Sequence, residues 1–110
     1  MKKVDYNKLV RDKIPEIIEA TNKRSKIRIL SDEEYIIKLN EKLDEELSEY
    51  QKNHSVEELV DLVEVIYAIL KSKDISLEAF DKLRKEKNQK RGCFDKKILL
   101  ESVFSEENHE

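Results

Sequence analysis

Leu43-Asp44-Glu45-Glu46-Leu47-Ser48-Glu49 and, a short way downstream, Glu57-Glu58-Leu59-Val60-Asp61-Leu62 are the two stretches that decide how this chain folds. Each holds two acids three residues apart: Glu46 with Glu49, and Glu58 with Asp61. Residues at this spacing lie on one face of a helix, one turn from each other. The pattern has two interpretations, a divalent-metal site built from four carboxylates or two ordinary solvated helix faces.

Two serine capping boxes predict where the helices around these acids begin. Ser31 is followed three residues later by Glu34, and Ser55 in the same way by Glu58. Apolar residues recur at helical spacing after each box, which predicts helices over about 32–52 and 56–73. Only Asn53-His54 and the second cap separate them, so the two helices should pack as an antiparallel hairpin.

Shorter elements flank the predicted hairpin. Pro15 suits the first turn of a short helix that ends near Lys23, and Gly92 suits the end of a helix that begins after Ser76. Alternating and apolar residues predict a minor two-stranded β element over about 26–30 and 95–101. We therefore expect an all-α fold, with residues 1–104 as a single domain and 105–110 as a frayed polar tail.

The composition fits a charged helical protein. Of the 110 residues, 43% are charged and 38% are hydrophobic, and only one glycine and one proline are present, whereas all-β folds need many turn residues. The net charge of -3 predicts no binding to nucleic acid. The start has no apolar signal-peptide core and the longest apolar run, 65–70, is far too short for a membrane span, so we expect a cytoplasmic protein that does not bind membranes.

Helical geometry alone leaves the convergence of the four acids open. At about 100° per residue, Glu46 lies roughly 60° from an apolar stripe centred on Leu43, and Glu58 lies roughly 80° from one centred on Ile66. In an isolated antiparallel hairpin these flanks would fall on opposite edges. A third helix or a second subunit would be needed to bring them to a common cleft.

Three motifs, taken in order, resemble those of the MazG-like all-α nucleoside triphosphate pyrophosphatases. The two acidic pairs resemble that family's ExxE…ExxD signature. Tyr6-Asn7-Lys8-Leu9-Val10-Arg11-Asp12-Lys13-Ile14-Pro15 is similar to the opening of a small branch of predicted house-cleaning enzymes for noncanonical nucleotides. Arg91-Gly92-Cys93-Phe94 resembles the RGGF-type element of that branch, with Cys93 in place of a second glycine. The resemblance runs from about residue 6 to 101 and implies a four-helix MazG-like arrangement around the hairpin.

The resemblance implies an enzyme that hydrolyses nucleoside triphosphates to monophosphate and pyrophosphate with Mg²⁺, or with Mn²⁺ as the alternative. Carried over, Glu46, Glu49, Glu58 and Asp61 are the metal ligands. Carboxylate oxygens are the protein ligands that Mg²⁺ takes, together with waters and substrate phosphate. Glu45 or one of the four ligands, Glu46 among them, would accept the proton of the attacking water.

Basic residues supply the expected substrate contacts. Lys8, Arg11 and Lys13 are the phosphate-binding candidates, with Asp12 orienting Arg11. A second candidate cluster, Lys90 and Arg91, has the alternative interpretation of charges that favour a solvated helix end. We expect a homo-oligomer, either a dimer or a dimer of dimers. Two other functions stay open: a non-catalytic helical interaction or regulatory module, and a phosphoribosyl-ATP pyrophosphohydrolase.

Overall fold

The two serine caps begin the two long helices within a residue of where the sequence predicts. In the computed structural model, which describes residues 2–106, the Ser31 hydroxyl accepts from the Glu34 amide, the Glu34 carboxylate accepts from the Ser31 amide, and helix α2 spans Asp32–Asn53. The Ser55 hydroxyl accepts a hydrogen bond from the Glu58 amide, and helix α3 spans Val56–Ser72. The capping box predicted at Ser31 forms in full, whereas at Ser55 only the serine half forms, because the Glu58 carboxylate accepts from Asn53 instead. The serine caps set the starts of both helices.

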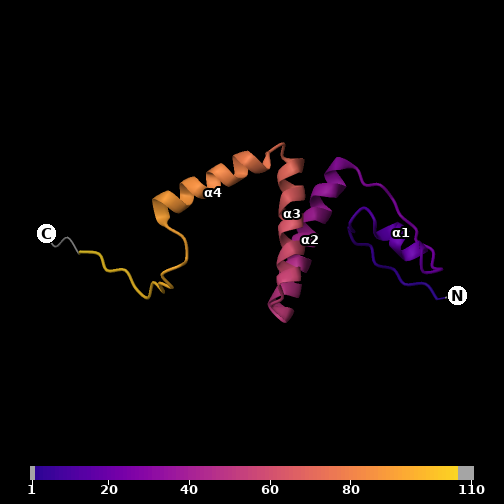
Figure 1. Cartoon of the computed structure of the whole chain (residues 1–110), viewed down its shortest axis with the longest axis horizontal. Helices are drawn as coiled ribbons and strands as arrows, with labels where there is room; N and C mark the ends of the chain where they lie inside the picture. The colour runs from indigo at the N-terminus through magenta and orange to yellow at the C-terminus, as the bar shows by residue number, and fades with distance from the viewer. Residues whose placement is uncertain (1, 107–110) are drawn as a thin grey trace. The chain divides into compact units, whose positions relative to one another are not determined.

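Helices α2 and α3 pack against each other as an antiparallel hairpin (Figure 1). His54 closes the hairpin turn in the left-handed conformation, with φ of 54°. Its amide donates to the Tyr50 carbonyl at 2.7 Å, and its ring lies edge-on to the Tyr50 ring at 5.6 Å between centroids. Because so short a connection allows little freedom, it holds the end of α2 beside the start of α3.

The described chain divides into two compact units, one up to Leu77 and one from Glu78 onward. The first holds the hairpin and the short helix α1, Ile14–Glu19, with its proline in the first turn as predicted. This helix stops four residues before the predicted Lys23. The Thr21 hydroxyl donates to the Ile18 carbonyl at 2.6 Å, and Asn22 has φ of 61°, so local side-chain bonding and a left-handed residue replace further helical turns.

Helix α4, Leu77–Arg91, is the helix of the second unit among the described residues. Gly92 ends it with φ of 82°, and the Gly92 amide donates to the Asn88 carbonyl at 2.7 Å. This left-handed glycine cap agrees with the prediction. A single domain over residues 1–104 stays a prediction. Residues 105 and 106 of the predicted tail are exposed and irregular, and the remainder of that tail, 107–110, lies outside the described residues.

The predicted two-stranded β element is wrong. Residues 2–106 contain four helices and no strand, and the segments 26–30 and 95–101 are largely exposed and irregular. The apolar side chains of Ile27, Ile29 and Ile98 all lie exposed to solvent. An isolated pair of short strands is marginal in water without a third strand or a helix to cover one face, so alternation alone did not make these segments pair.

The described chain buries very little apolar surface. Its buried hydrophobic residues are Leu39, Val65 and Leu70, which are 2%, 8% and 7% exposed, and all three lie in the hairpin. Glu46, 9% exposed, is the buried charged residue among them. Across the described residues, the helices lack the combination of length and apolar character that crossing a bilayer requires. The fold class is therefore all-α, with one helical hairpin as its main packed element.

Candidate metal centre

The buried residues of α2 and α3 lie on the helix faces that pack against each other, which we call the seam. Closer to the hairpin turn, acidic residues occupy the next positions on these faces. Glu46 follows the buried Leu39 by seven residues, which is two turns along the same face of α2. On α3, Glu58 and Asp61 precede the buried Val65 by seven and four residues. Helical geometry from the sequence put Glu46 on the flank of the stripe, whereas the structure puts this residue in the seam itself.

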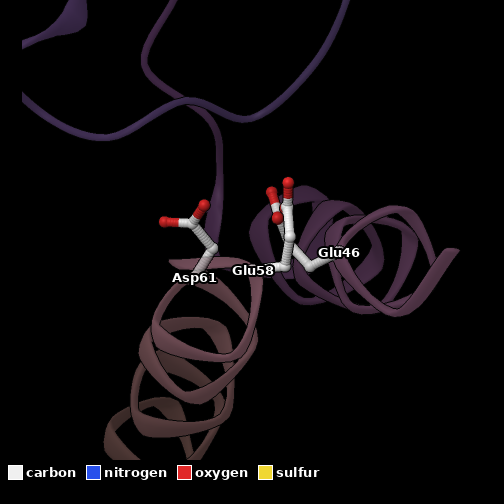
Figure 2. Close-up of side chains that lie close together, drawn as sticks. All are labelled: Glu46, Glu58 and Asp61. Carbon is white, nitrogen blue, oxygen red and sulfur yellow. The ribbon is translucent and has the colours of Figure 1, made fainter. Parts of the chain in front are cut away.

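Three carboxylates meet on one side of the hairpin (Figure 2). Glu46 from α2 and Glu58 and Asp61 from α3 each offer one oxygen, and these three oxygens all lie within 4.8 Å of one another. We call these three residues the acidic cluster. The hairpin alone brings them together, so no third helix or second subunit is needed for this part of the predicted site. The structure does not bring Glu49, one turn further along α2, into this group.

Carboxylates in a helix seam destabilise the fold unless other groups compensate their charge. Each member of the acidic cluster has such a partner. Lys42 Nζ lies 3.4 Å from Glu46 Oε1, and Asn53 Nδ2 donates to Glu58 Oε1 at 3.2 Å. Arg11 donates from its Nη2 to Asp61 Oδ1 at 2.8 Å. The cluster is thus an acidic site that protein donors already partly neutralise.

The basic string near the N-terminus lies against this acidic edge of the hairpin. We call residues 7–11 the docked segment. Besides the Arg11–Asp61 pair, Lys8 Nζ donates to Glu45 Oε1 at 3.1 Å, and Lys38 Nζ donates to the Asn7 carbonyl at 3.4 Å. Figure 2 shows the indigo N-terminal chain on the side toward which the three carboxyl groups project. Two predicted phosphate ligands are therefore already paired with acids of the candidate site.

Glu45 is held ionised by its lysine neighbours. Partial burial raises the pKa of Glu45, but the hydrogen bond from Lys8 and the nearby charges of Lys42 and Lys8 lower that pKa by more, so its net shift is downward. Lys42 Nζ also lies 3.4 Å from Glu45 Oε2. A carboxylate with a lowered pKa is a weak proton acceptor, so this environment suits an anchor for Lys8 better than a general base.

Asp12 and Lys13, two further predicted site residues, form no hydrogen bond or ion pair with the acidic cluster in the described chain. Lys13 caps the start of α1 through its backbone position, and within residues 2–106 its side chain makes no ion pair. Arg11 pairs with Asp61, and no contact with the predicted partner Asp12 is found in the described chain. Lys90 and Arg91 occupy the exposed last turn of α4 in the second unit, where the helix dipole favours cations.

Sequence reasoning missed two residues of the site. Lys42 contacts both Glu45 and Glu46, and Asn53 contacts Glu58. Lys42 was detectable in principle, because it precedes the two glutamates by three and four residues, the spacing at which helix side chains meet. No sequence signal pointed to Asn53, since its contact spans the hairpin turn and depends on how that turn folds.

The acidic cluster fits a hard divalent cation. Mg²⁺ binds oxygen ligands at 2.0–2.1 Å in octahedral geometry, which separates opposite ligands by about 4.2 Å. Neighbouring ligands in that geometry lie closer, about 2.9 Å apart. The three carboxylate oxygens lie within 4.8 Å of one another, a wider limit than either separation, and they provide the negative charge that such an ion needs. The residues present thus suit Mg²⁺ in the chemistry of their ligand atoms, and the absence of cysteine or histidine from the group disfavours softer metals.

Comparison with known proteins identifies a partial relative. An "Uncharacterized protein" of Mycolicibacterium smegmatis (strain ATCC 700084 / mc(2)155) is 56% identical over 41 residues, which are 37% of this chain. The similarity spans 42% of that protein's length, less than half. No family model matches the chain, and no solved structure matches it. The fold and site together define an all-helical protein with a three-carboxylate cluster on a helical hairpin.

Proposed function

We propose that this protein is a Mg²⁺-dependent nucleotide pyrophosphohydrolase that cleaves nucleoside triphosphates, noncanonical ones in particular, to monophosphate and pyrophosphate. One observation carries the proposal: Arg11 of the basic string contacts Asp61 of the acidic cluster, and Lys8 of the same string contacts Glu45, the residue next to Glu46. A site for this reaction needs both features, carboxylates for a cation and basic side chains for a polyphosphate. The resemblance to the MazG-like family rests on the same residues.

The cluster residues Glu46, Glu58 and Asp61 would hold the metal, with Glu49 as a further ligand. The bound ion would supply Lewis-acid polarisation of the α-phosphate and lower the pKa of a bound water. In the reaction, a water oxygen forms a bond to the α-phosphorus, the bond from that phosphorus to the oxygen bridging to the β-phosphorus breaks, and pyrophosphate leaves. The water proton passes to a carboxylate. Of the two candidates, Glu46 is preferred over Glu45, because the lysine contacts that lower the pKa of Glu45 make it a weaker proton acceptor.

Basic side chains of the N-terminal string would bind the phosphates. Arg11 offers a planar fork of donors that matches phosphate oxygens, whereas Lys8 and Lys13 act as point charges. Lys13 is free of ion pairs in the described chain, so it is available to an anion at once. Lys90 and Arg91 are proposed as additional phosphate ligands from the end of α4.

The proposed enzyme acts as a homo-oligomer, a dimer or a dimer of dimers, in the cytoplasm. A hollow beside Leu39 and Ile69 in the hairpin measures about 70 Å³, far below the roughly 300 Å³ at which small-molecule pockets begin. Exposed apolar residues on both hairpin helices offer a surface that a second copy would cover. A nucleotide pocket would then be completed by that second surface.

Pyrophosphate release tests this function. The assay presents canonical, modified and deoxy nucleoside triphosphates and phosphoribosyl-ATP, each with and without Mg²⁺. Glu46→Gln and Asp61→Asn should fold normally and lose at least about 100-fold in kcat/KM, since each removes a ligand charge from the metal site. A matched control is Glu64→Gln on the same helix as Asp61, which lies outside the cluster and should keep its activity.

The outcome separates the three functions under consideration. Metal-dependent turnover confined to phosphoribosyl-ATP would assign the narrower pyrophosphohydrolase activity. No turnover of any nucleotide with either Mg²⁺ or Mn²⁺ would reject the enzyme and leave the non-catalytic helical module. Full activity in either the Glu46 or the Asp61 variant would reject the metal ligands proposed here.

A further inference from the structure

We infer that Arg11 is the resident counter-ion of the acidic cluster and that a divalent cation displaces it from Asp61. This inference rests on the proposed function, because it concerns how the metal and the substrate reach the same site. It assigns Arg11 two successive partners: the Asp61 carboxylate in the metal-free protein, and an anionic ligand once the cation is bound. Metal binding then frees Arg11 from Asp61, while the rest of the docked segment stays bound to the hairpin.

The contact between Arg11 and Asp61 is the strongest observation behind the inference. Its 2.8 Å length is the shortest ion-pair distance between the docked segment and the hairpin. The two residues are 50 positions apart, so the pair is a tertiary contact and cannot be explained by neighbouring positions on one helix. Both side chains remain about half exposed, at 53% and 42%, which leaves room for the pair to separate.

Arg11 and a bound cation compete for the same negative charge. Asp61 offers an oxygen to the acidic cluster, and its Oδ1 accepts the hydrogen bond from Arg11. A guanidinium and a divalent ion brought to one carboxylate repel each other, because their charges have the same sign. The Lys8–Glu45 pair and the Lys38–Asn7 bond do not involve cluster residues, so they can retain the segment while Arg11 swings free.

Release of Arg11 has a consequence for substrate binding. A guanidinium that leaves Asp61 stays near the cation, because Lys8, three residues earlier in the chain, remains paired with Glu45. It would then meet the phosphate oxygens of a metal-bound nucleotide, which its donor fork suits. Metal and nucleotide binding are thereby coupled through one side chain, and the coupling is reciprocal.

Metal binding alone, without nucleotide, tests the inference. Mn²⁺ affinity is measured by electron paramagnetic resonance for the wild type, Arg11→Gln and Arg11→Lys. Displacement predicts that Arg11→Gln binds Mn²⁺ about two- to five-fold more tightly, the range that an exposed ion pair of this kind can contribute. Arg11→Lys, which keeps the charge but loses the planar fork, should lie between. Lys13→Gln removes the same charge from the same stretch without an ion pair and controls for long-range repulsion.

A second readout follows the Arg11 side chain directly. In the wild-type protein, the nuclear magnetic resonance signal of the Arg11 Nε–Hε group should shift during a Mg²⁺ titration with the same midpoint as metal binding. Weaker Mn²⁺ binding in Arg11→Gln would instead mean that Arg11 supports the metal site, and it would overturn the inference. So would a gain no larger than that of Lys13→Gln, or an Arg11 signal that stays fixed as the metal binds. Absence of Mn²⁺ binding in every variant would remove the metal site itself and with it the proposed function.

Discussion

At the scale of single residues, Glu46 of the acidic cluster lies at a position where a helical hairpin normally buries an apolar group, whereas Glu58 and Asp61 are partly exposed. Glu46 is as buried as Val65 and Leu70, yet it is an acid. Charged side chains in such a seam reduce stability even when they are paired, so their presence indicates a purpose other than packing. The compensation by Lys42, Asn53 and Arg11 keeps this cost low without removing the negative charge available to a cation.

The lowered pKa of Glu45 gives a prediction for acid stability. A carboxyl group whose pKa falls on folding, from the usual value of 4.5, adds stability above pH 4.5, and this contribution is lost as the pH falls through the lower folded value. Glu45→Gln should therefore unfold at lower denaturant than the wild type at neutral pH, by less than about 1 kcal/mol. The difference should shrink as the pH falls below 4.5 and through the lower folded pKa of Glu45.

Urea denaturation at a series of pH values measures this difference. Glu64→Gln, a change of the same kind at a carboxylate without an ion pair in the described chain, is the matched control. A difference between wild type and Glu45→Gln that grows on acidification would show that the lysine contacts of Glu45 do not stabilise the fold.

At the scale of elements, the helix caps decide where the site forms. The Ser55 cap sets the first turn of α3, which contains Glu58, and Asp61 lies in the next turn. An ordered first turn holds Glu58 and Asp61 on one face of α3, three residues apart. Glu58 thus has two local contacts, its amide with Ser55 and its carboxylate with Asn53 across the turn.

Removal of the Ser55 cap should weaken the hairpin. Ser55→Ala leaves the Glu58 amide without its side-chain acceptor and should lower the free energy of unfolding by about 1 kcal/mol. Ser55→Asn, which supplies another good capping oxygen, should restore most of this loss. Thermal unfolding followed by circular dichroism compares the three proteins. Equal stability of the alanine variant and the wild type would mean that tertiary packing, not the cap, sets the start of α3.

At the scale of the whole molecule, the hairpin exposes more apolar surface than a lone helix pair should. On α3 a second stripe runs through Val56, Val60, Val63 and Tyr67, at heptad spacing, and all four residues are exposed. Such a stripe is typical of a helix that packs against two neighbours. If two copies of the protein paired through this stripe with their α3 helices antiparallel, Glu57 near the start of one α3 would lie near Lys71 at the end of the other.

This stripe predicts self-association. The wild type should sediment as a dimer or larger, and its midpoint of thermal unfolding should rise with protein concentration. Val60→Glu, which places a charge in the middle of the stripe, should shift the protein toward monomer. Ile29→Glu is the control, because Ile29 is 85% exposed outside the hairpin, whereas Val60 is 58% exposed within it. A wild type that sediments as a monomer at every concentration would reject the homo-oligomer.

The sequence by itself determined the elements that local chemistry controls. Serine caps, helical periodicity and Gly92 predicted three helices to within a residue or two, because a cap or a left-handed stop acts on its own helix. A strand needs a partner to pair with, and here the same reasoning failed. The alternation of apolar Ile27 and Ile29 with charged residues predicted a strand, but this segment is irregular and exposed.

Only the tertiary structure decided which of the acids meet. Spacing identified four acids together: Glu46, Glu49, Glu58 and Asp61. Whether they converge depends on how α2 is rotated against α3, and the pattern within one helix does not determine that rotation. The packing of α2 against α3 brings Glu46, Glu58 and Asp61 into one cluster and leaves Glu49 outside it. It also brought Arg11 to Asp61 across 50 residues, a contact that depends on the path of the chain and has no local signal in the sequence.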